Sequence, residues 1–255
     1  MNVVVLAKYV PNPNGVPEMG SDFRLKREGV EGALDPGDEH GVEAALQLAE
    51  GSGGEVTIVS MGPEVALAGV RRALSMGAHK AVLVTDERLR GADALVTARV
   101  LAAALKRLEF DVVIGGVEST DGSTGTLPMT VAELLGLPSA TFARKIEARD
   151  GSLLVERQTE SGYDSIECPL PALVTVTAAV NEPRYPTLKG IMQAKQKPLE
   201  QLSVEDLGLS AEDTTPVQEV VGVEPVADRA SGEVVEDAAE APAKVVAFLS
   251  KAKVI

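Results

Sequence analysis

The stretch that decides the fold is "EVTIVSMGPEVALAGVRRALSMGAHKAVLVT", residues 55–85. It begins and ends with an apolar run of strand length, and between these runs Leu67, Val70 and Leu74 recur at helical spacing. Both runs are continuously apolar rather than alternating, which is typical of strands that helices cover on both faces. The stretch therefore predicts a strand, a covering helix and a second strand of one parallel sheet.

The same alternation continues on both sides of this unit. Apolar runs of strand length occur at residues 2–7, 55–60, 81–85 and 110–116. Apolar residues at helical spacing mark a first helix (Val42, Leu46, Ala49) and a third (Leu101, Leu105, Leu108), and a fourth helix is expected near 124–136. Because crossovers between parallel strands are right-handed, the pattern predicts a doubly wound, mostly parallel α/β sheet of the adenine-nucleotide-binding type.

Beyond this region the pattern changes to short strand-like pieces, at 139–148, 152–158, 163–168 and 172–180. The turn "RDGS" (149–152) predicts that two of them form a hairpin. We expect these pieces to be a small antiparallel extension of the sheet. Residues 1–200 are thus predicted to form an α/β nucleotide-binding domain.

Residues 201–255 are predicted to be an extended acidic arm, with a short helix possible at 242–252. Between residues 200 and 243 there are twelve Asp and Glu against the lone base Arg229, so this segment carries most of the net charge of −14. Such acidity argues against non-specific binding of nucleic acid, which depends on clustered Lys and Arg. An arm without periodicity is ordered only on the surface of a partner, and we expect it to pack on a partner subunit.

Cysteine, histidine and the N-terminus exclude several classes of protein. The single cysteine, Cys168, has no internal disulfide partner, and His40 and His79 offer no metal-ligand spacing, so no metal site is expected. The apolar run in "MNVVVLAKYV" is too short for a signal segment or a membrane span. We therefore expect a cytoplasmic protein that is not inserted in a membrane.

The stretch "GGVESTDGSTGTLP", residues 115–128, follows the fourth strand and opens a helix; we call it the glycine-rich loop. Its glycines let the backbone approach a ligand, and free N–H groups at the helix start favour an anion. The loop matches neither the Walker pattern nor the dinucleotide GxGxxG pattern. It is interpreted either as a phosphate cradle or as a tight turn in which Ser and Thr only cap the helix.

Two shorter stretches, "LDPGDE" (34–39) and "SMGPE" (60–64), fall at the same edge of the predicted sheet. Asp38 is interpreted as the N-cap of the first helix, and Gly62-Pro63 as a turn into the second. No Ser-His-Asp or Cys-His arrangement and no isolated carboxylate pair stands out as catalytic machinery. The sequence therefore predicts a binding protein without substrate turnover of its own.

The segment "NEPRYPTLKGIMQAKQK", residues 181–197, is basic although the chain is acidic; we call it the basic segment. Pro183 and Pro186 restrict the backbone before Leu188, and a helix can start directly after it. Leu188 is therefore expected at the tip of a short rigid turn. The alternative is an ordinary connection with solvated lysines.

Several motifs together carry a resemblance to a known family. In the order "VLAKYVP", "SMGPE", "RRALSMGAHKAV", "ESTDG", "VNEPRYPTLKGIMQAKQKPLE" and "DLGL", these motifs occur along residues 1–210 and resemble the electron-transfer flavoprotein β subunit. The resemblance implies a heterodimer in which an α subunit holds most of the redox-active FAD and the β subunit is folded around a structural AMP. It also implies electron donors of the acyl-CoA dehydrogenase type, as in fatty acid oxidation, and a membrane quinone oxidoreductase as acceptor.

The resemblance also implies which residues bind. The AMP site would be formed by Leu6, Ala7, Asp35, Pro36, Gly37, Asp38, Met61, Gly116, Val117, Glu118, Ser119, Thr120, Asp121, Gly122, Ser123, Thr124, Gly125, Thr126 and Leu127. The dehydrogenase or the α subunit would be contacted by Arg184, Tyr185, Leu188, Lys189, Ile191 and Met192, with Leu188 entering an apolar pocket of the dehydrogenase. Lys195 and Lys197 are further candidates for steering the encounter.

Two alternatives remain open at this stage. The Asp-Gly-x-Thr pattern that opens "DGSTGTLP" (121–128), within the glycine-rich loop, is similar to electron-bifurcating relatives, whose β subunit binds a second FAD and NAD. The fold alone also fits a stand-alone adenine-nucleotide-binding regulator, which leaves the basic segment without a role.

Overall fold

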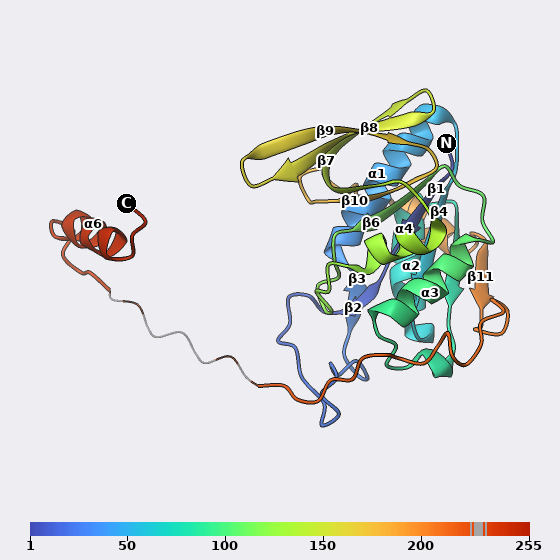
Figure 1. Cartoon of the computed structure of the whole chain (residues 1–255), viewed down its shortest axis with the longest axis horizontal. Helices are drawn as coiled ribbons and strands as arrows, with labels where there is room; N and C mark the ends of the chain where they lie inside the picture. Colours follow the sequence, from blue (N-terminus) through green and yellow to red (C-terminus); the bar gives the residue numbers. More distant parts are fainter. Residues whose placement is uncertain (225, 227–231, 233) are drawn as a thin grey trace. The chain divides into compact units, whose positions relative to one another are not determined.

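The structure is a computed structural model that describes residues 1–224, 226, 232 and 234–255. The chain divides into two compact units, Met1–Val220 and Val221–Ile255, each of which is described by itself. Figure 1 shows the first unit as a sheet between layers of helices.

The described residues of the first unit form a nine-stranded sheet in the order β11-β5-β4-β1-β6-β10-β7-β8-β9. Neighbours from β11 to β7 are parallel, and β7, β8 and β9 are antiparallel. The strands are β1 (Val3–Leu6), β4 (Val56–Met61), β5 (Lys80–Val84), β6 (Val112–Gly116), β7 (Ser139–Arg149), β8 (Ser152–Thr159), β9 (Gly162–Pro169), β10 (Ala172–Val176) and β11 (Leu199–Leu202). The doubly wound α/β fold predicted from the sequence is confirmed.

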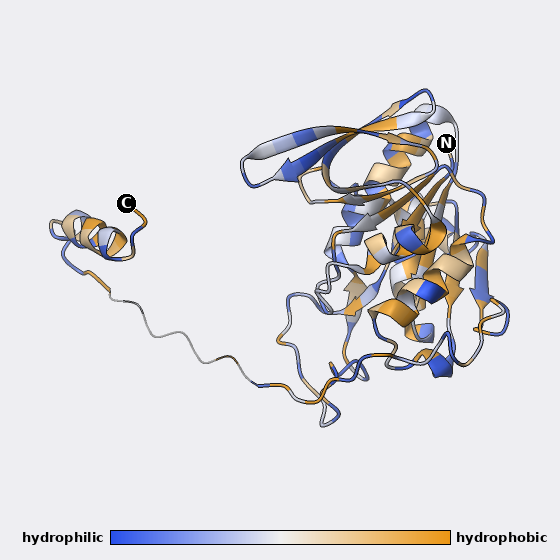
Figure 2. Cartoon of the chain, in the orientation of Figure 1, coloured by the Kyte–Doolittle hydropathy of each residue, from blue (hydrophilic) through white to orange (hydrophobic). Residues whose placement is uncertain are grey.

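Helices cover both faces of the parallel part because successive side chains of each buried strand point to opposite faces. Val3 and Val5 of β1 pack in the core layer with α1 (Pro36–Ser52) and α2 (Leu67–Met76). Val4 and Leu6 pack in the other layer with α3 (Ala94–Leu105) and α4 (Leu127–Leu135). Figure 2 shows the resulting apolar strands between helices that carry both apolar and polar residues.

The predicted helical faces are mostly correct. Val42, Leu46 and Ala49 are buried on α1, and Val70 and Leu74 on α2. Leu101 and Leu105 are buried on α3, but the helix ends at Leu105, so Leu108 packs against the core from the following turn. The turn at Gly62-Pro63 leads through the short helix η1 (Glu64–Ala66) into α2, as expected.

One strand was assigned to the wrong part of the sheet. The "RDGS" hairpin between β7 and β8 is confirmed, but β10 is not antiparallel: it lies parallel between β6 and β7, with Ala172 opposite Val112. The physical reason is burial, because all five residues of β10 are buried, as in the other central parallel strands. The antiparallel extension therefore consists of β7, β8 and β9.

Several short strands and helices were not predicted from the sequence. β2 (Tyr9–Pro11) and β3 (Gly32–Leu34) form a separate two-stranded antiparallel sheet, joined by the long connection 12–31. η2 (Glu87–Leu89) precedes α3. α5 (Leu188–Ala194) lies within the basic segment. Three- and four-residue strands are too short to show a periodicity.

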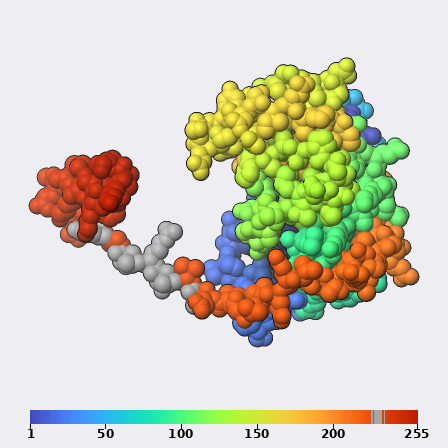
Figure 3. All heavy atoms as spheres, in the orientation of Figure 1, coloured from blue at the N-terminus to red at the C-terminus, as the bar shows by residue number. Residues whose placement is uncertain are grey.

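The C-terminal region begins as part of the first unit. β11 includes residue 200 and pairs with β5. The backbone N–H groups of Val217 and Gln218 donate hydrogen bonds to the carboxylate of Asp93. Figure 3 shows the segment from about 200 to 220, in orange, lying against the body of this unit. The domain boundary expected at 200 and the packing of the arm on a partner stay predictions.

The second unit contains α6 (Ala241–Lys251), which matches the helix predicted at 242–252. Asp228, Arg229 and Glu233 of the acidic arm lie outside the described residues. In the part of the chain that the structure describes, no helix has the length and apolar character needed to cross a membrane.

Candidate functional site

The site predicted from the sequence lies where the winding of the sheet reverses. β1 is flanked by β4 on one side and by β6 on the other, so the carboxyl ends of β1 and β6 open a crevice where doubly wound sheets bind ligands. Leu6 ends β1 and Ala7 follows it, Asp35 caps α1 and Pro36–Asp38 begin it, Met61 ends β4, and residues 116–127 join β6 to α4. The structure thus brings all of these predicted residues to one edge.

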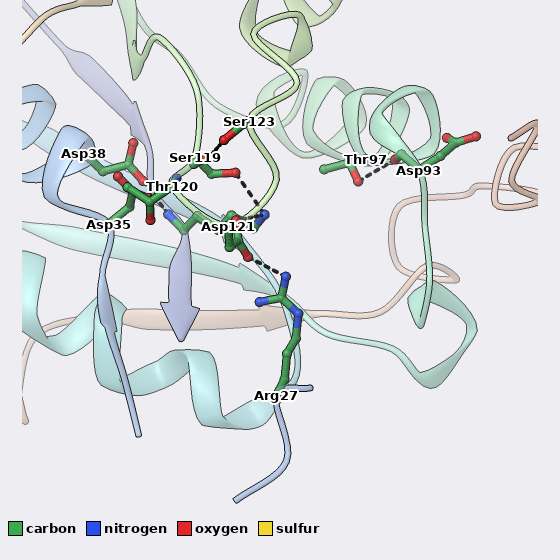
Figure 4. Close-up of polar contacts among 10 residues, drawn as sticks. Arg27, Asp35, Asp38, Asp93, Thr97, Ser119, Thr120, Asp121 and Ser123 are labelled. Carbon is green, nitrogen blue, oxygen red and sulfur yellow. Dashed lines mark hydrogen bonds and ion pairs between the residues drawn. The ribbon is translucent and has the colours of Figure 1, made fainter. Parts of the chain in front are cut away.

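Asp35, and not Asp38, is the N-cap of α1, because the helix begins at Pro36. The side chain of Asp35 is fully buried, and its Oδ1 accepts a hydrogen bond from the Gly37 N–H at 2.9 Å. Its Oδ2 accepts from both the N–H and the hydroxyl of Thr120, at 2.7 and 2.8 Å. Asp35 therefore ties the glycine-rich loop to the start of α1, as Figure 4 shows.

Asp38 lies in the first turn of α1 and points into the sheet edge. Its Oδ2 accepts from the Lys8 N–H at 2.7 Å, and its carboxyl group also accepts from the Gly116 N–H. Burial, reinforced by the nearby charge of Asp35, raises the pKa of Asp38 to about 8. A Cβ at position 116 would lie 2.9 Å from Asp38 Oδ1, so this close approach explains the glycine.

Asp121 is held between two cations. Lys8 Nζ lies 2.7 Å from Asp121 Oδ1 and 3.2 Å from Ser119 Oγ, and Arg27 pairs with the other carboxylate oxygen. Burial raises the pKa of Asp121, but the charges and hydrogen bonds of Lys8 and Arg27 outweigh it, so the pKa lies below its ordinary value. Figure 4 shows Arg27 reaching the loop from a separate segment.

The sequence places Lys8 at the end of the first strand, at this edge of the sheet, but assigns it no binding role, and Arg27 was not among the predicted site residues. Lys8 directly follows the first strand, which is a usable signal for the sheet edge. Arg27 comes from the connection between β2 and β3 and is separated from Asp121 by 94 positions, so no local pattern connects them.

The glycine-rich loop presents free donors at the start of α4. Within the described residues, the backbone N–H groups of Thr124, Gly125, Thr126 and Leu127 donate to no acceptor of the chain. Thr126 is the N-cap residue but its side chain makes no capping hydrogen bond, so the interpretation of the loop as a mere cap is not supported at this helix.

The backbone of this loop adopts left-handed conformations at two positions before α4. Ser123 and Gly125 both have positive φ, at 44° and 61°. Such turns, together with a helix start, form a concave array of N–H groups that suits an anion such as phosphate. The carboxylate of Glu118 lies against Gly125, with Oε2 3.5 Å from an ideal Cβ position, so a bound anion would share the loop with it.

The basic segment exposes apolar side chains, and its residues 182–185 line a pocket together with Pro36, Glu39 and His40 of α1 and Arg72 of α2. Leu188 is the first residue of α5, after the N-cap Thr187, and its exposed fraction is 76%. Tyr185, Ile191 and Met192 are exposed beside it in the sequence. This confirms the expected exposure of the leucine at a helix start.

Two cations of the basic segment have partners within the chain. Arg184 pairs with Glu43 and Glu50 of α1. Lys197 Nζ donates to the carbonyl oxygens of Leu74 and Ala78, at 2.9 and 2.6 Å.

The cysteine and the histidine considered as catalytic candidates, Cys168 and His40, lie in ordinary structural surroundings. Cys168 is buried, and burial raises the pKa of its thiol. His40 Nδ1 lies 3.0 Å from the carbonyl oxygen of Asn181. Among the described residues, no group of three or more His, Cys, Asp or Glu side chains is arranged to hold a metal ion.

Comparison with known proteins places the chain in a family. The model of the electron transfer flavoprotein domain matches residues 22–207. The chain is 39% identical to the electron transfer flavoprotein subunit beta of Mycobacterium bovis over 264 aligned positions, which cover 100% of this chain and 99% of the relative. The chain belongs to the electron transfer flavoprotein β-subunit family. The resemblance noted in the sequence motifs is thereby confirmed.

Other relatives in the electron transfer flavoprotein family are similarly distant. The subunit beta of Bacillus subtilis is 39% identical over 219 positions, covering 85% of this chain and 84% of the relative. A protein of Acetobacterium woodii named caffeyl-CoA reductase-Etf complex subunit CarD is 38% identical over 214 positions, covering 83% and 82%. The role of an electron transfer flavoprotein subunit is therefore shared across the family.

Proposed function

We propose that the chain is the β subunit of a heterodimeric electron transfer flavoprotein. Such a protein accepts electrons from acyl-CoA-type dehydrogenases in the cytoplasm and passes them to a membrane quinone oxidoreductase through FAD, which the α subunit mainly holds. The full-length match to a β subunit carries this proposal. The chain itself acts as a carrier subunit without substrate turnover.

The crevice at the sheet edge is proposed to bind a structural AMP. We expect the free N–H groups at 124–127 to hold the phosphate, and we expect Leu6, Ala7, Asp35 and Met61, which lie at the same edge of the sheet, to line the adenosine part of the site. AMP, when bound, supplies a fixed scaffold and no redox chemistry. The hydrogen bonds of Asp35 to Thr120 support this role, because they fix the loop before the nucleotide arrives.

The exposed apolar residues of the basic segment are proposed to dock the electron-donating dehydrogenase. Leu188 is the anchor, and Tyr185, Ile191 and Met192 surround it in the sequence. One large apolar side chain that fills a pocket contributes about 1.5–3 kcal/mol through burial. Lys189 is exposed and adds positive charge for the encounter.

The second unit, Val221–Ile255, is proposed to be the part of the acidic arm that packs on the α subunit. α6 has no buried residue among those described, and it exposes Val245, Val246 and Phe248. A short helix gains most of its stability from packing an apolar face, so these residues support a partner surface.

The docking role is tested by Leu188→Ala in the purified heterodimer. We expect electron transfer from the dehydrogenase to slow at limiting donor, because the anchor is lost, while flavin content and thermal midpoint stay near wild type. Stopped-flow reduction of the flavin at several donor concentrations measures this.

Leu134→Ala, a partly exposed leucine on α4, is the matched control and should leave the transfer kinetics unchanged. Unaltered kinetics in Leu188→Ala, or a broad loss of stability in that variant, would make the basic segment a structural connection instead.

A second candidate function is an electron-bifurcating complex in which this chain binds FAD and NAD(H). Two observations favour it: the "DGST" sequence at 121–124 in the glycine-rich loop, and the similarity to a subunit of a caffeyl-CoA reductase-Etf complex. Visible absorbance separates the two candidates, because the second requires two flavins in each heterodimer and the first requires one.

A further inference from the structure

All three guanidinium nitrogens of Arg184, in the basic segment, donate hydrogen bonds to carboxylates of the same chain. Nε donates to Glu43 Oε2 at 2.7 Å and Nη2 to Glu43 Oε1 at 3.1 Å. Nη1 and Nη2 donate to the two oxygens of Glu50, at 2.6 and 3.1 Å. The Arg184 backbone N–H also donates to Glu43, at 3.2 Å. The side chain is therefore committed to two carboxylates of α1.

Glu43 and Glu50 are placed so that a single planar guanidinium group can bind both carboxylates. Glu43 and Glu50 are separated by two helical turns, so they lie on the same face of α1. Glu43 is 4% exposed, and Gln47 Nε2 also donates to it at 2.8 Å. Burial raises the pKa of Glu43, but the hydrogen bonds from Arg184 and Gln47 outweigh it and hold the pKa below its ordinary value. A lysine has no second arm with which to span both groups.

Further contacts fasten the basic segment on both sides of Arg184. Asn181 Nδ2 donates to the carbonyl oxygen of His40 at 3.0 Å. Lys197 bonds to carbonyl oxygens at the end of α2. Between them, a Cβ on Gly190 would lie 2.4 Å from the carbonyl oxygen of Ser75, so α5 lies directly against α2. The segment is thus held on α1 and α2 over its length.

The result is a fixed backbone from which apolar side chains project. Tyr185, Leu188 and Met192 have exposed fractions of 85%, 76% and 67%, although the residues that carry the segment are tied down. A rigid anchor loses little conformational entropy when it enters a pocket, which is the benefit of preorganisation.

We propose that Arg184 is a positioning residue that clamps the basic segment to α1 and so holds Leu188 ready for docking, instead of contacting the partner itself. This inference rests on the proposed docking function. It assigns the charge of Arg184 to ion pairs within this chain and leaves the docking surface mainly apolar.

The test uses two variants of the purified heterodimer, Arg184→Gln and Glu50→Gln. Arg184→Gln removes the clamp but leaves the buried Glu43 without its cation, so it also lowers stability. Glu50→Gln weakens only the exposed half of the clamp and keeps Glu43 paired. Amide hydrogen exchange over 183–194 is measured together with transfer from the dehydrogenase at varied concentration.

We expect exchange over 183–194 to quicken in both variants, and more in Arg184→Gln. The donor concentration at half-maximal rate should rise by about tenfold in Arg184→Gln and less in Glu50→Gln, while the rate at saturating donor stays near wild type. Arg184→Lys should recover thermal stability but not the wild-type exchange, because it cannot span both carboxylates.

Arg90→Gln removes an exposed cation far from the segment in the sequence and controls for charge alone. An equal rise in half-maximal concentration in Arg90→Gln, or wild-type exchange in both clamp variants, would overturn the proposal. Leu188→Ala is measured in parallel. Faster exchange in the clamp variants without any effect of Leu188→Ala would overturn the docking function and leave the clamp in place.

Discussion

At the scale of single residues, Asp38 is the group whose protonation the fold changes most clearly. Its carboxyl group is buried at the edge of the sheet beside Asp35, and its pKa is raised to about 8. Between about pH 4 and pH 8, the folded state therefore keeps a proton on Asp38 that the unfolded state has already released. Stability from this group is present at low pH and is lost as the pH rises towards 8.

Asp38→Asn should remove this dependence, because the amide stays neutral while its oxygen still accepts from the Lys8 N–H. Relative to the variant, the wild type should lose up to roughly 4 kcal/mol between pH 5 and pH 8. Thermal midpoints of both heterodimers at the two pH values measure the difference. Glu109→Gln, an exposed carboxyl, is the control; a parallel pH response in wild type and Asp38→Asn would show that Asp38 is ionised when buried.

At the scale of elements, α6 is the part of the chain that most needs a partner. A chain that ends after Val220 keeps the whole first unit, including β11 and the contacts of Asp93 with Val217 and Gln218. We expect the shortened chain to fold but to bind the α subunit more weakly, because the apolar residues of α6 are lost. Co-purification with the α subunit in rising salt measures this, and undiminished association would make the second unit a solvated tail.

Some helices and strands can be predicted from the sequence, and others cannot, for a physical reason. Long buried strands and amphipathic helices have periodicities of their own, so β1, β4, β5 and β6 and the helices between them were predictable. β10 was placed wrongly because its position depends on pairing with β6, a strand far away in the chain. β2, β3 and β11 are defined by their partners more than by their own residues.

The candidate site divides in the same way. Leu6, Ala7 and the glycine-rich loop follow strands, and the rule that ligands bind at the carboxyl edge finds them. Arg27 and the clamp between Arg184 and α1 are long-range contacts, and Asp35 as N-cap was missed because α1 begins earlier than the motif suggested.

At the scale of the whole molecule, the chain combines a glycine-rich loop at the edge of the sheet, a basic segment with exposed apolar residues and a separate C-terminal unit. The glycine-rich loop and the basic segment are both carried by the first unit, and each is fixed by buried carboxylates of α1, Asp35 for the loop and Glu43 for the segment. One helix thus positions both surfaces. This arrangement suits a subunit that supports electron transfer between other proteins.

The most direct test of the account is the composition of the native complex. The chain is purified from its source without reconstitution, its partner is identified, and the nucleotides released on denaturation are separated and counted. We predict a second chain, the α subunit, with one FAD and one AMP for each heterodimer. Two flavins and no AMP, or a chain that purifies alone without nucleotide, would contradict it.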